Sequence, residues 1–258
     1  MPENAKEKLH RERRGSVMLL WLDDPSRRNA LSVEMAAELV AAVERAEADD
    51  EVRAVVVTGE PPAFCAGADL SHLESADGTG LRAVYDGFSR LVSCTKLTVA
   101  AVNGAAVGAG MNLALACDVR VAAERARFDT RFLSLGLHPG GGHTWMLERA
   151  VGYQAAAALL LGGQVVSGAE AQRIGLAYRL VADDAGVDEA VALAEGAGAA
   201  SPELLRRTKR SLAAVPERTY EEALESELAD QLWSTRQPEF AERVASMRRS
   251  ISSKGGDS

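Results

Sequence analysis

The segment "GAAVGAGMNLALACD" (104–118) places three glycines in seven positions, directly before an apolar stretch. Glycine-rich loops can bind phosphates, but the order Gly104, Gly108, Gly110 reverses a dinucleotide-binding fingerprint, and no lysine is present to make a P-loop. Close packing of a strand against a helix would also explain the small residues. A third interpretation uses the helix expected from about residue 109. Its first N–H groups lack partners within the helix, carry the positive end of the dipole, and can stabilise an oxygen that gains negative charge during a reaction.

A second turn of small residues, "FCAGADL" (64–70), also follows an apolar strand and also offers unobstructed backbone amides. Two such turns on neighbouring parallel strands would meet at the carboxyl ends of the strands, where open α/β sheets bind ligands. One N–H group from each turn would form a two-pronged oxyanion hole. The pair therefore favours a site that polarises a carbonyl oxygen.

The elements that must position these turns alternate between strand and helix. Apolar runs at 16–22, 53–59 and 97–104 are typical of buried strands. Ser32 is a predicted N-cap of a helix whose apolar residues recur every three or four positions, namely Met35, Leu39, Val43 and Ala46. A later segment predicts a second helix with apolar residues on one face, namely Val84, Phe88, Leu91 and Val92. This alternation predicts an α/β fold with mostly parallel pairing.

Beyond residue 150 the pattern is helical. Ser167 and Glu170 have the spacing of a capping box, and Ser201 with Pro202 would begin another helix. We therefore predict a core over residues 1–200 and a helical region over residues 201–258. The helical region must pack either on the α/β core of the same chain or on a neighbouring subunit.

Bulk properties exclude several classes of function. The chain has 258 residues, 47% of them hydrophobic, and a net charge of −8, which gives no electrostatic case for nucleic acid as a partner. Its three cysteines lack zinc-site spacing, so no metal site is expected and a reducing compartment is favoured. The first residues lack the apolar core of a signal peptide, and no run of about 18 apolar residues is present. We expect a cytoplasmic protein without a membrane partner.

Five segments, in order along nearly the whole chain, resemble the enoyl-CoA hydratase/isomerase (crotonase) family. They are "RRNAL" (27–31), "FCAGADL" (64–70), "AAVNGAAVGAGMNLALACDVRVA" (100–122), "ARFDTRFLSLGLHPGGGHTWML" (126–147) and "GAEAQRIGLAYRLV" (168–181). The resemblance implies a crotonase-like spiral of ββα units with a C-terminal helical region, assembled as a homotrimer or a dimer of trimers. It also implies an acyl-CoA substrate, with coenzyme A as part of that substrate and no separate cofactor.

By the same resemblance, the oxyanion donors would be the backbone amides of Ala68 and Ala109. The family positions implied to bind substrate are Arg28, Ala66, Asp69, Leu70 and Phe132. A surface position on a turn explains Arg28 equally well, and capping of the next helix explains Asp69 equally well. The two glutamates with which hydratases of the family deprotonate water fall on Asn112 and Phe132, neither of which takes up a proton near neutral pH. A position at which some relatives carry an aspartate falls on Gly140. Ordinary hydration is therefore doubtful, because general acid–base groups contribute about 100- to 10,000-fold each.

Of the remaining ionisable residues, His138 directly precedes "PGGG" and is the candidate acid–base group, because a histidine titrates near neutral pH. His72 and His143 are interpreted as structural, and Asp129 and Glu74 as solvated carboxylates. Asn112 can orient a water molecule and Phe132 can form a pocket wall. The sequence thus favours an enzyme that stabilises a thioester enolate through Ala68 and Ala109; the alternative is a non-catalytic acyl-CoA carrier or sensor.

Overall fold

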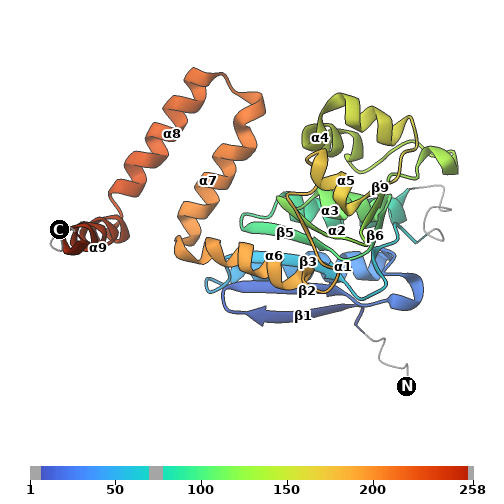
Figure 1. Cartoon of the computed structure of the whole chain (residues 1–258), viewed down its shortest axis with the longest axis horizontal. Coiled ribbons are helices and arrows are strands. Elements are labelled where there is room, and N and C mark those ends of the chain that lie inside the picture. The colour runs from blue at the N-terminus through green and yellow to red at the C-terminus, as the bar shows by residue number, and fades with distance from the viewer. Residues whose placement is uncertain (1–6, 70–77, 255–258) are drawn as a thin grey trace. The chain divides into compact units, whose positions relative to one another are not determined.

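In the computed structural model of the chain, residues 7–69 and 78–254 are described, and the chain forms two compact units, Met1–Ala200 and Ser201–Ser258 (Figure 1). The first unit contains both sheets and the helices that cover them. The second unit consists of helices and their connections.

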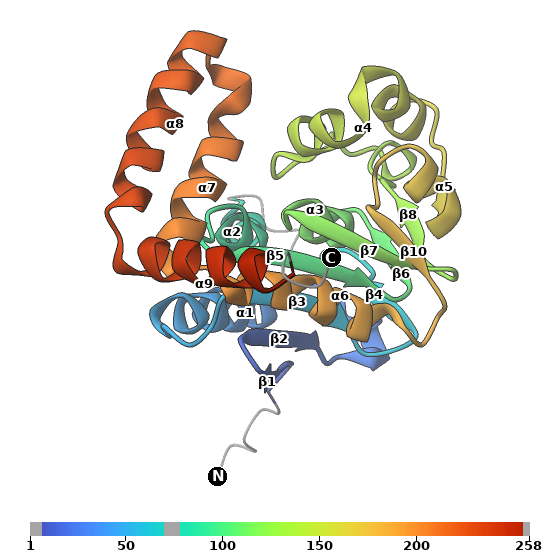
Figure 2. The ribbon, with the colours of Figure 1, turned by 60° about the vertical axis from the view of Figure 1, so that its left-hand side comes forward.

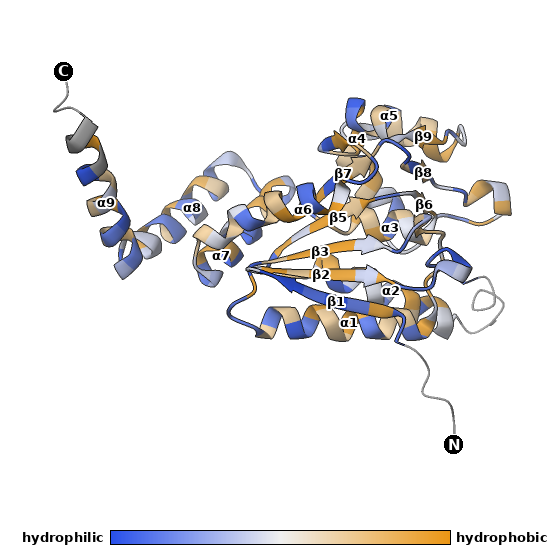
Figure 3. Cartoon of the chain, turned by 60° about the horizontal axis from the view of Figure 1, so that its bottom comes forward, coloured by the Kyte–Doolittle hydropathy of each residue, from blue (hydrophilic) through white to orange (hydrophobic). Residues whose placement is uncertain are grey.

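The larger sheet has the strand order β1-β2-β3-β5-β7-β10. Its strands are β1 (Leu9–Arg14), β2 (Val17–Leu22), β3 (Ala54–Gly59), β5 (Leu97–Val102), β7 (Val119–Ala123) and β10 (Arg179–Val181). β1 pairs antiparallel with β2, and the other neighbouring strands pair in parallel. Figure 3 shows that β1 is hydrophilic whereas β2, β3 and β5 are apolar. The charged N-terminal segment, for which no strand was expected, is thus an edge strand, where charged side chains discourage pairing with other chains.

The smaller sheet has the order β4-β6-β8-β9. Its strands are β4 (Ala63–Cys65), β6 (Ala105–Val107), β8 (Arg127–Asp129) and β9 (Val166–Ser167). The chain passes from a long strand to a short strand and then to a helix, as β3-β4-α2 (Thr79–Val92), β5-β6-α3 (Ala109–Leu115) and β7-β8-α4 (His143–Leu160). These repeats are the predicted spiral of ββα units, which is confirmed.

The core lies on both faces of the larger sheet. Ser32 caps α1 (Val33–Ala48) as predicted, and its Oγ accepts a hydrogen bond of 3.2 Å from the N–H of Met35. Met35, Leu39 and Val43 of α1 pack in one cluster with alternate strand residues, including Leu20, Leu22, Val55, Val57, Ala100 and Val102. Because side chains alternate along a strand, the residues between them face the other side, where α6 (Gly186–Glu195) contacts β2, β3, β5 and β7. Burial on both faces explains the unbroken apolar runs.

Two expectations about the elements need correction. Residues beyond 150 are not wholly helical: β9 precedes α5 (Gly168–Arg173), and β10 follows it. Strands of two or three residues are too short to show a periodicity. Val92 does not share the buried face of α2 but is 48% exposed, because it is the last residue of that helix. The described part of the first unit also contains short 3-10 helices at Pro25–Arg27, Leu133–Leu135 and Gly196–Ala199.

The second unit comprises α7 (Pro202–Ala214), a 3-10 turn (Val215–Glu217), α8 (Tyr220–Thr235) and α9 (Pro238–Lys254). Figures 1 and 2 show α7 and α8 side by side, joined by a hydrogen bond of 2.5 Å from Arg207 Nη1 to Asp230 Oδ1. Thr219 and Glu222 form a reciprocal capping box at the start of α8. Neither α7 nor α8 buries a side chain fully in the single chain.

Candidate functional site

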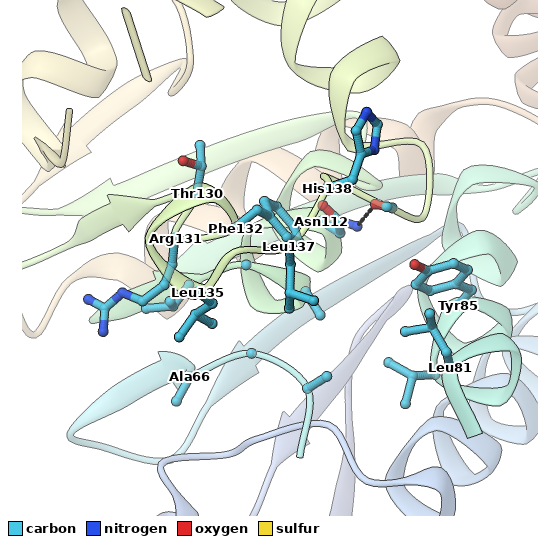
Figure 4. A pocket seen from close by; sticks show the side chains of 17 residues that line it. Ala66, Leu81, Tyr85, Asn112, Thr130, Arg131, Phe132, Leu135, Leu137 and His138 are labelled. Carbon is cyan, nitrogen blue, oxygen red and sulfur yellow. Dashed lines mark hydrogen bonds between the residues drawn. The ribbon is translucent and has the colours of Figure 1, made fainter. Parts of the chain in front are cut away.

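A cavity of about 280 Å³ lies where the turns after β4 and β6 meet α2 and the loop that follows β8 (Figure 4). Small residues line one part of it, namely Ala66, Gly67, Ala68, Gly108, Ala109 and Gly140. Apolar side chains line another part, namely Leu81, Val84, Val107, Phe132, Leu135 and Leu137. The polar side chains are those of Tyr85, Asn112, Thr130, Arg131 and His138. Among the described residues that line the cavity, none carries a carboxylate.

The two small-residue turns lie side by side because β4 and β6 are neighbouring parallel strands, with Ala63 opposite Ala105 and Cys65 opposite Ala106. Glycine is required where they meet. A Cβ atom on Gly110 would lie 2.1 Å from the carbonyl oxygen of Cys65, well inside van der Waals contact. Gly67 has φ of 113°, a conformation that other residues rarely adopt. The glycines of the opening motif therefore allow close packing, and that packing brings the two turns to one cavity.

The orientation of the Ala68 amide follows from its neighbours. The carbonyl oxygen of Gly67 accepts a hydrogen bond of 2.7 Å from the N–H of Leu31. The C=O of Gly67 and the N–H of Ala68 belong to one trans peptide group and point in opposite directions. The N–H of Ala68 therefore points away from Leu31, and it donates no hydrogen bond to another described residue.

The amide of Ala109 is the first of α3, with Gly108 as the N-cap, as the expected helix start near residue 109 predicted. A first-turn N–H has no partner within its own helix, and this one donates no hydrogen bond to the rest of the described chain. Both candidate donors thus belong to residues that line the same cavity.

Asn112, at a position implied to carry a hydratase glutamate, is 1% exposed and held from both ends of its amide. Its Nδ2 donates a hydrogen bond of 2.9 Å to the carbonyl oxygen of Gly140 (Figure 4). Its Oδ1 contacts Nδ1 of His143 at short hydrogen-bond range. The opposite amide orientation would place two oxygens against each other, so Oδ1 must accept and Nδ1 of His143 must carry the hydrogen.

His143 is fully buried, and burial lowers its pKa to about 4, so the imidazole is neutral at pH 7. With the hydrogen on Nδ1, its Nε2 is a buried acceptor that has no partner in the described part of the chain. The interpretation of His143 as structural is incomplete, because the residue fixes the amide of Asn112. Because His143 lies 31 residues from Asn112 along the chain, the sequence alone does not indicate this contact.

Phe132, at the second glutamate position, lines the cavity and packs edge-on against the imidazole of His143, with 4.9 Å between ring centroids. His138 also lines the cavity. Its Nδ1 lies 2.7 Å from the carbonyl oxygen of Pro139, an acceptor, so Nδ1 carries a hydrogen, and Nε2 forms no hydrogen bond with another described residue. In the view of Figure 4 the imidazole of His138 extends away from Ala66 and Leu81.

The predicted substrate-binding residues are only partly brought together. Ala66 lines the cavity, and its N–H donates a hydrogen bond of 3.0 Å to the carbonyl oxygen of Arg28. Arg28 adopts a left-handed backbone conformation with φ of 52° and is exposed. Asp69 does not line the cavity; its Oδ2 accepts a hydrogen bond of 2.5 Å from Arg27. Leu70 lies outside the described residues, as do His72 and Glu74.

Two features of the site differ from the sequence interpretation. Asp129 is not a solvated carboxylate: it is 8% exposed, and its Oδ2 accepts a hydrogen bond of 2.9 Å from Nε of Arg131. Tyr85 was missed altogether, because an aromatic residue on an amphipathic helix is typical of core packing. Only the contact between α2 and the loop at Gly140 identifies it as part of the cavity.

Within the described residues, no cluster of three or more His, Cys, Asp or Glu side chains is placed to hold a metal ion. The same part of the chain contains no helix that combines the length and the apolar character needed to cross a bilayer. Burial raises the pKa of the Cys65 thiol to about 12, which fits core filling rather than a nucleophile.

Comparison with known proteins gives consistent matches. The family model described as enoyl-CoA hydratase/isomerase matches residues 12–245. A Mycobacterium tuberculosis protein named "Probable enoyl-CoA hydratase EchA14" is 51% identical over 239 residues, which cover 89% of this chain and 93% of that protein. The 2,3-dehydroadipyl-CoA hydratase of Escherichia coli is 37% identical over 224 residues, 85% of each chain. The crystal structure of an enoyl-CoA hydratase from Polaromonas sp. JS666 superimposes with a TM-score of 0.88 and 30% identity, over 94% of this chain and 97% of that one.

Proposed function

This chain belongs to the enoyl-CoA hydratase/isomerase family, and from that premise we propose that it binds an acyl-CoA thioester and stabilises its enolate through the amides of Ala68 and Ala109. The observation that carries this proposal is the pair of amides without hydrogen-bond partners in the described chain, on turns of neighbouring parallel strands that line one cavity. Donors held in place before the reaction stabilise developing charge without reorganisation, and one such donor contributes about 3–4 kcal/mol to the transition state.

The chemistry follows from a polarised thioester carbonyl. Hydrogen bonds to its oxygen draw charge away from the α-carbon, so a proton can leave or join that carbon, or a nucleophile can add at the β-carbon. The exposed guanidinium of Arg28, on the turn bonded to Ala66, is proposed to meet the phosphates of coenzyme A. Asp69 is proposed to shape that part of the site through its ion pair with Arg27. Coenzyme A enters as part of the substrate, and no separate cofactor is proposed.

His138 is the proposed acid–base group. Its position on the cavity lining, and an Nε2 atom that no other described residue engages in a hydrogen bond, support this role. Because its ring extends away from Ala66 and Leu81 in Figure 4, the role requires the ring to turn inward when substrate binds. Asn112 is proposed to orient a water molecule or the substrate, since its amide is fixed by His143 and Gly140.

Changing His138→Ala should lower turnover of crotonyl-CoA by about tenfold or more, because a positioned acid–base group contributes about 100-fold or more. The change His10→Ala is the matched control, since it removes an exposed imidazole from β1, outside the cavity. Steady-state kinetics of the three proteins provide the measurement. Equal turnover in His138→Ala and the control would remove His138 from the mechanism.

A non-catalytic acyl-CoA carrier or sensor is the second candidate. Its support is the absence of a carboxylate from the described residues that line the cavity. Exchange of α-protons in deuterated water, followed by mass spectrometry of a saturated acyl-CoA, separates the two candidates. Exchange supports enolate stabilisation, whereas tight binding without exchange or turnover supports the carrier. Absence of binding, exchange and turnover would reject both.

We also propose that the second unit, Ser201–Ser258, packs against neighbouring subunits of a homotrimer or dimer of trimers, and that the protein is cytoplasmic. The apolar side chains left exposed on its helices support the assembly, among them Leu212, Leu224, Leu228, Leu232 and Phe240. Light scattering should give three or six times the 27.3 kDa of one chain. The mass of a monomer at micromolar concentration would contradict the assembly.

A further inference from the structure

The hydroxyl group of Tyr85 lies in the cavity and has no part in the mechanism so far. Tyr85 is on α2, and its ring packs at a tilt against Phe88, with 5.5 Å between centroids. In Figure 4 the hydroxyl points from α2 toward Leu137 and Asn112. The ring is thus held by the core while its polar end faces the space where an acyl group would lie.

The hydroxyl occupies the space that a side chain at position 140 would need. A Cβ atom built on Gly140 would lie 2.1 Å from the hydroxyl oxygen of Tyr85 and 3.2 Å from its Cζ. All three of the nearest atoms to that Cβ belong to Tyr85. Glycine at 140 therefore makes room for the phenol, and Tyr85 supplies the polar group at this end of the cavity.

Asn112 lies at the same end, since its Nδ2 donates to the carbonyl oxygen of Gly140. The hydroxyl of Tyr85, in contrast, forms no hydrogen bond with another residue in the described ranges 7–69 and 78–254. Burial raises the pKa of Tyr85, so the hydroxyl keeps its proton at neutral pH. It is available as a hydrogen-bond donor and not as a phenolate base.

The ligand that fits such a donor has an oxygen on its acyl chain. If the thioester carbonyl rests on the amides of Ala68 and Ala109, the acyl chain lies in a cavity whose lining includes the apolar side chains of Leu81, Val84 and Phe132. An oxygen at the β-carbon then requires a polar partner inside this apolar lining, because a buried hydroxyl without a hydrogen bond is costly.

We propose that Tyr85 is a specificity-determining residue whose hydroxyl donates a hydrogen bond to an oxygen at the β-carbon, so that the cavity prefers 3-hydroxyacyl-CoA to the saturated acyl-CoA of equal length. This inference rests on the acyl-CoA function proposed above.

Equilibrium binding of two thioesters, 3-hydroxybutyryl-CoA and butyryl-CoA, tests it by calorimetry, with ligand composition checked by chromatography. The native protein should bind the hydroxylated thioester about five- to tenfold more tightly, the range expected for one hydrogen bond. The change Tyr85→Phe should bring the ratio of affinities to about one or below, because the 3-hydroxyl then has no partner, and should leave butyryl-CoA affinity unchanged. Tyr153→Phe removes the same hydroxyl from a residue that is 75% exposed and outside the cavity, and should keep the native ratio.

Gly140→Ala is a second, independent variant. Its new methyl group overlaps the Tyr85 hydroxyl, so the phenol must move and the preference should fall as in Tyr85→Phe. In the double variant with Tyr85→Phe, the new methyl group of Gly140→Ala meets no hydroxyl. The ratio of the two thioester affinities should then equal that of Tyr85→Phe alone. Thermal melting establishes that each variant is folded.

The outcomes separate this inference from the function on which it rests. Equal ratios in the native protein and Tyr85→Phe would overturn the role of Tyr85. A loss of affinity for both thioesters to the same degree would also overturn it, because that result describes a merely structural residue. Failure of the native protein to bind butyryl-CoA at all would instead overturn the acyl-CoA function.

Discussion

Replacement of Ala109 by proline should reduce α-proton exchange or turnover by about 100- to 1,000-fold, the effect expected when one oxyanion donor is lost. Proline has no backbone N–H, so the change removes the proposed donor and leaves the opposite amide, that of Ala68, in place. Rates would be measured at saturating acyl-CoA, since an interaction made in the transition state lowers kcat more than it weakens binding.

The local backbone accepts this proline. Ala109 is the first residue of α3, a position at which proline is common because its N–H would have no helical partner. Gly108, with φ of 50° and ψ of −113°, adopts the mirror image of the extended conformation that the residue before proline prefers, and glycine is achiral. The loss of rate would therefore come from the amide position itself, where the donor is missing and a ring methylene takes its place, and not from disruption of α3.

Val33→Pro is the matched control for Ala109→Pro. Val33 is the first residue of α1, follows Ser32 in an extended conformation, and does not line the cavity. The Val33→Pro change should leave the rate and the melting temperature nearly unchanged. Full activity in a folded Ala109→Pro variant would contradict the role of Ala109.

Acidification should destabilise the protein through His143. The pKa of this imidazole is about 4 in the folded chain, because of burial, and about 6.5 when unfolded. The unfolded state binds more protons between these two values. The contribution of His143 to the free energy of unfolding is therefore fully present above pH 6.5 and is lost as the pH falls toward 4. The free energy of unfolding should decrease by about 3 kcal/mol across this window.

Urea unfolding of the native protein and of His143→Asn, at several pH values from 7 to 4.5, measures this contribution. Asparagine does not titrate, and its side-chain N–H can replace Nδ1–H as the donor to Asn112. Carboxylates titrate in both proteins, so the difference between the two curves isolates His143. His10→Asn, at an exposed position on β1, should follow the native curve. Parallel curves for the native protein and His143→Asn would refute the prediction.

The fixed amide of Asn112 decides at which position a carboxylate can be introduced to test for hydration. His143 and Gly140 hold its two ends, which determines that Nδ2, a donor, faces the carbonyl of Gly140. A glutamate introduced at position 112 would place a carboxylate against that carbonyl oxygen. Phe132→Glu is therefore the better change for asking whether hydration returns when a carboxylate is supplied.

The sequence alone determined those parts of the fold whose information is local. The Ser32 cap, the α1 periodicity, the apolar runs of β2, β3 and β5, and the start of α3 depend on neighbouring residues, and each was predicted close to its observed bounds. The spiral of ββα units, in contrast, was predicted only from the resemblance of the five quoted segments to the family.

Tertiary structure decided the rest, because the deciding contacts join distant segments. The strands of the smaller sheet are two or three residues long, and only pairing identifies them. Asp129 becomes buried through its ion pair and strand position, although its residue type favours solvent. Tyr85 reaches the cavity because Gly140 lacks a side chain, and His143 holds Asn112 from another helix. The sequence thus specified where backbone donors can occur, whereas packing between separate elements selected which side chains surround them.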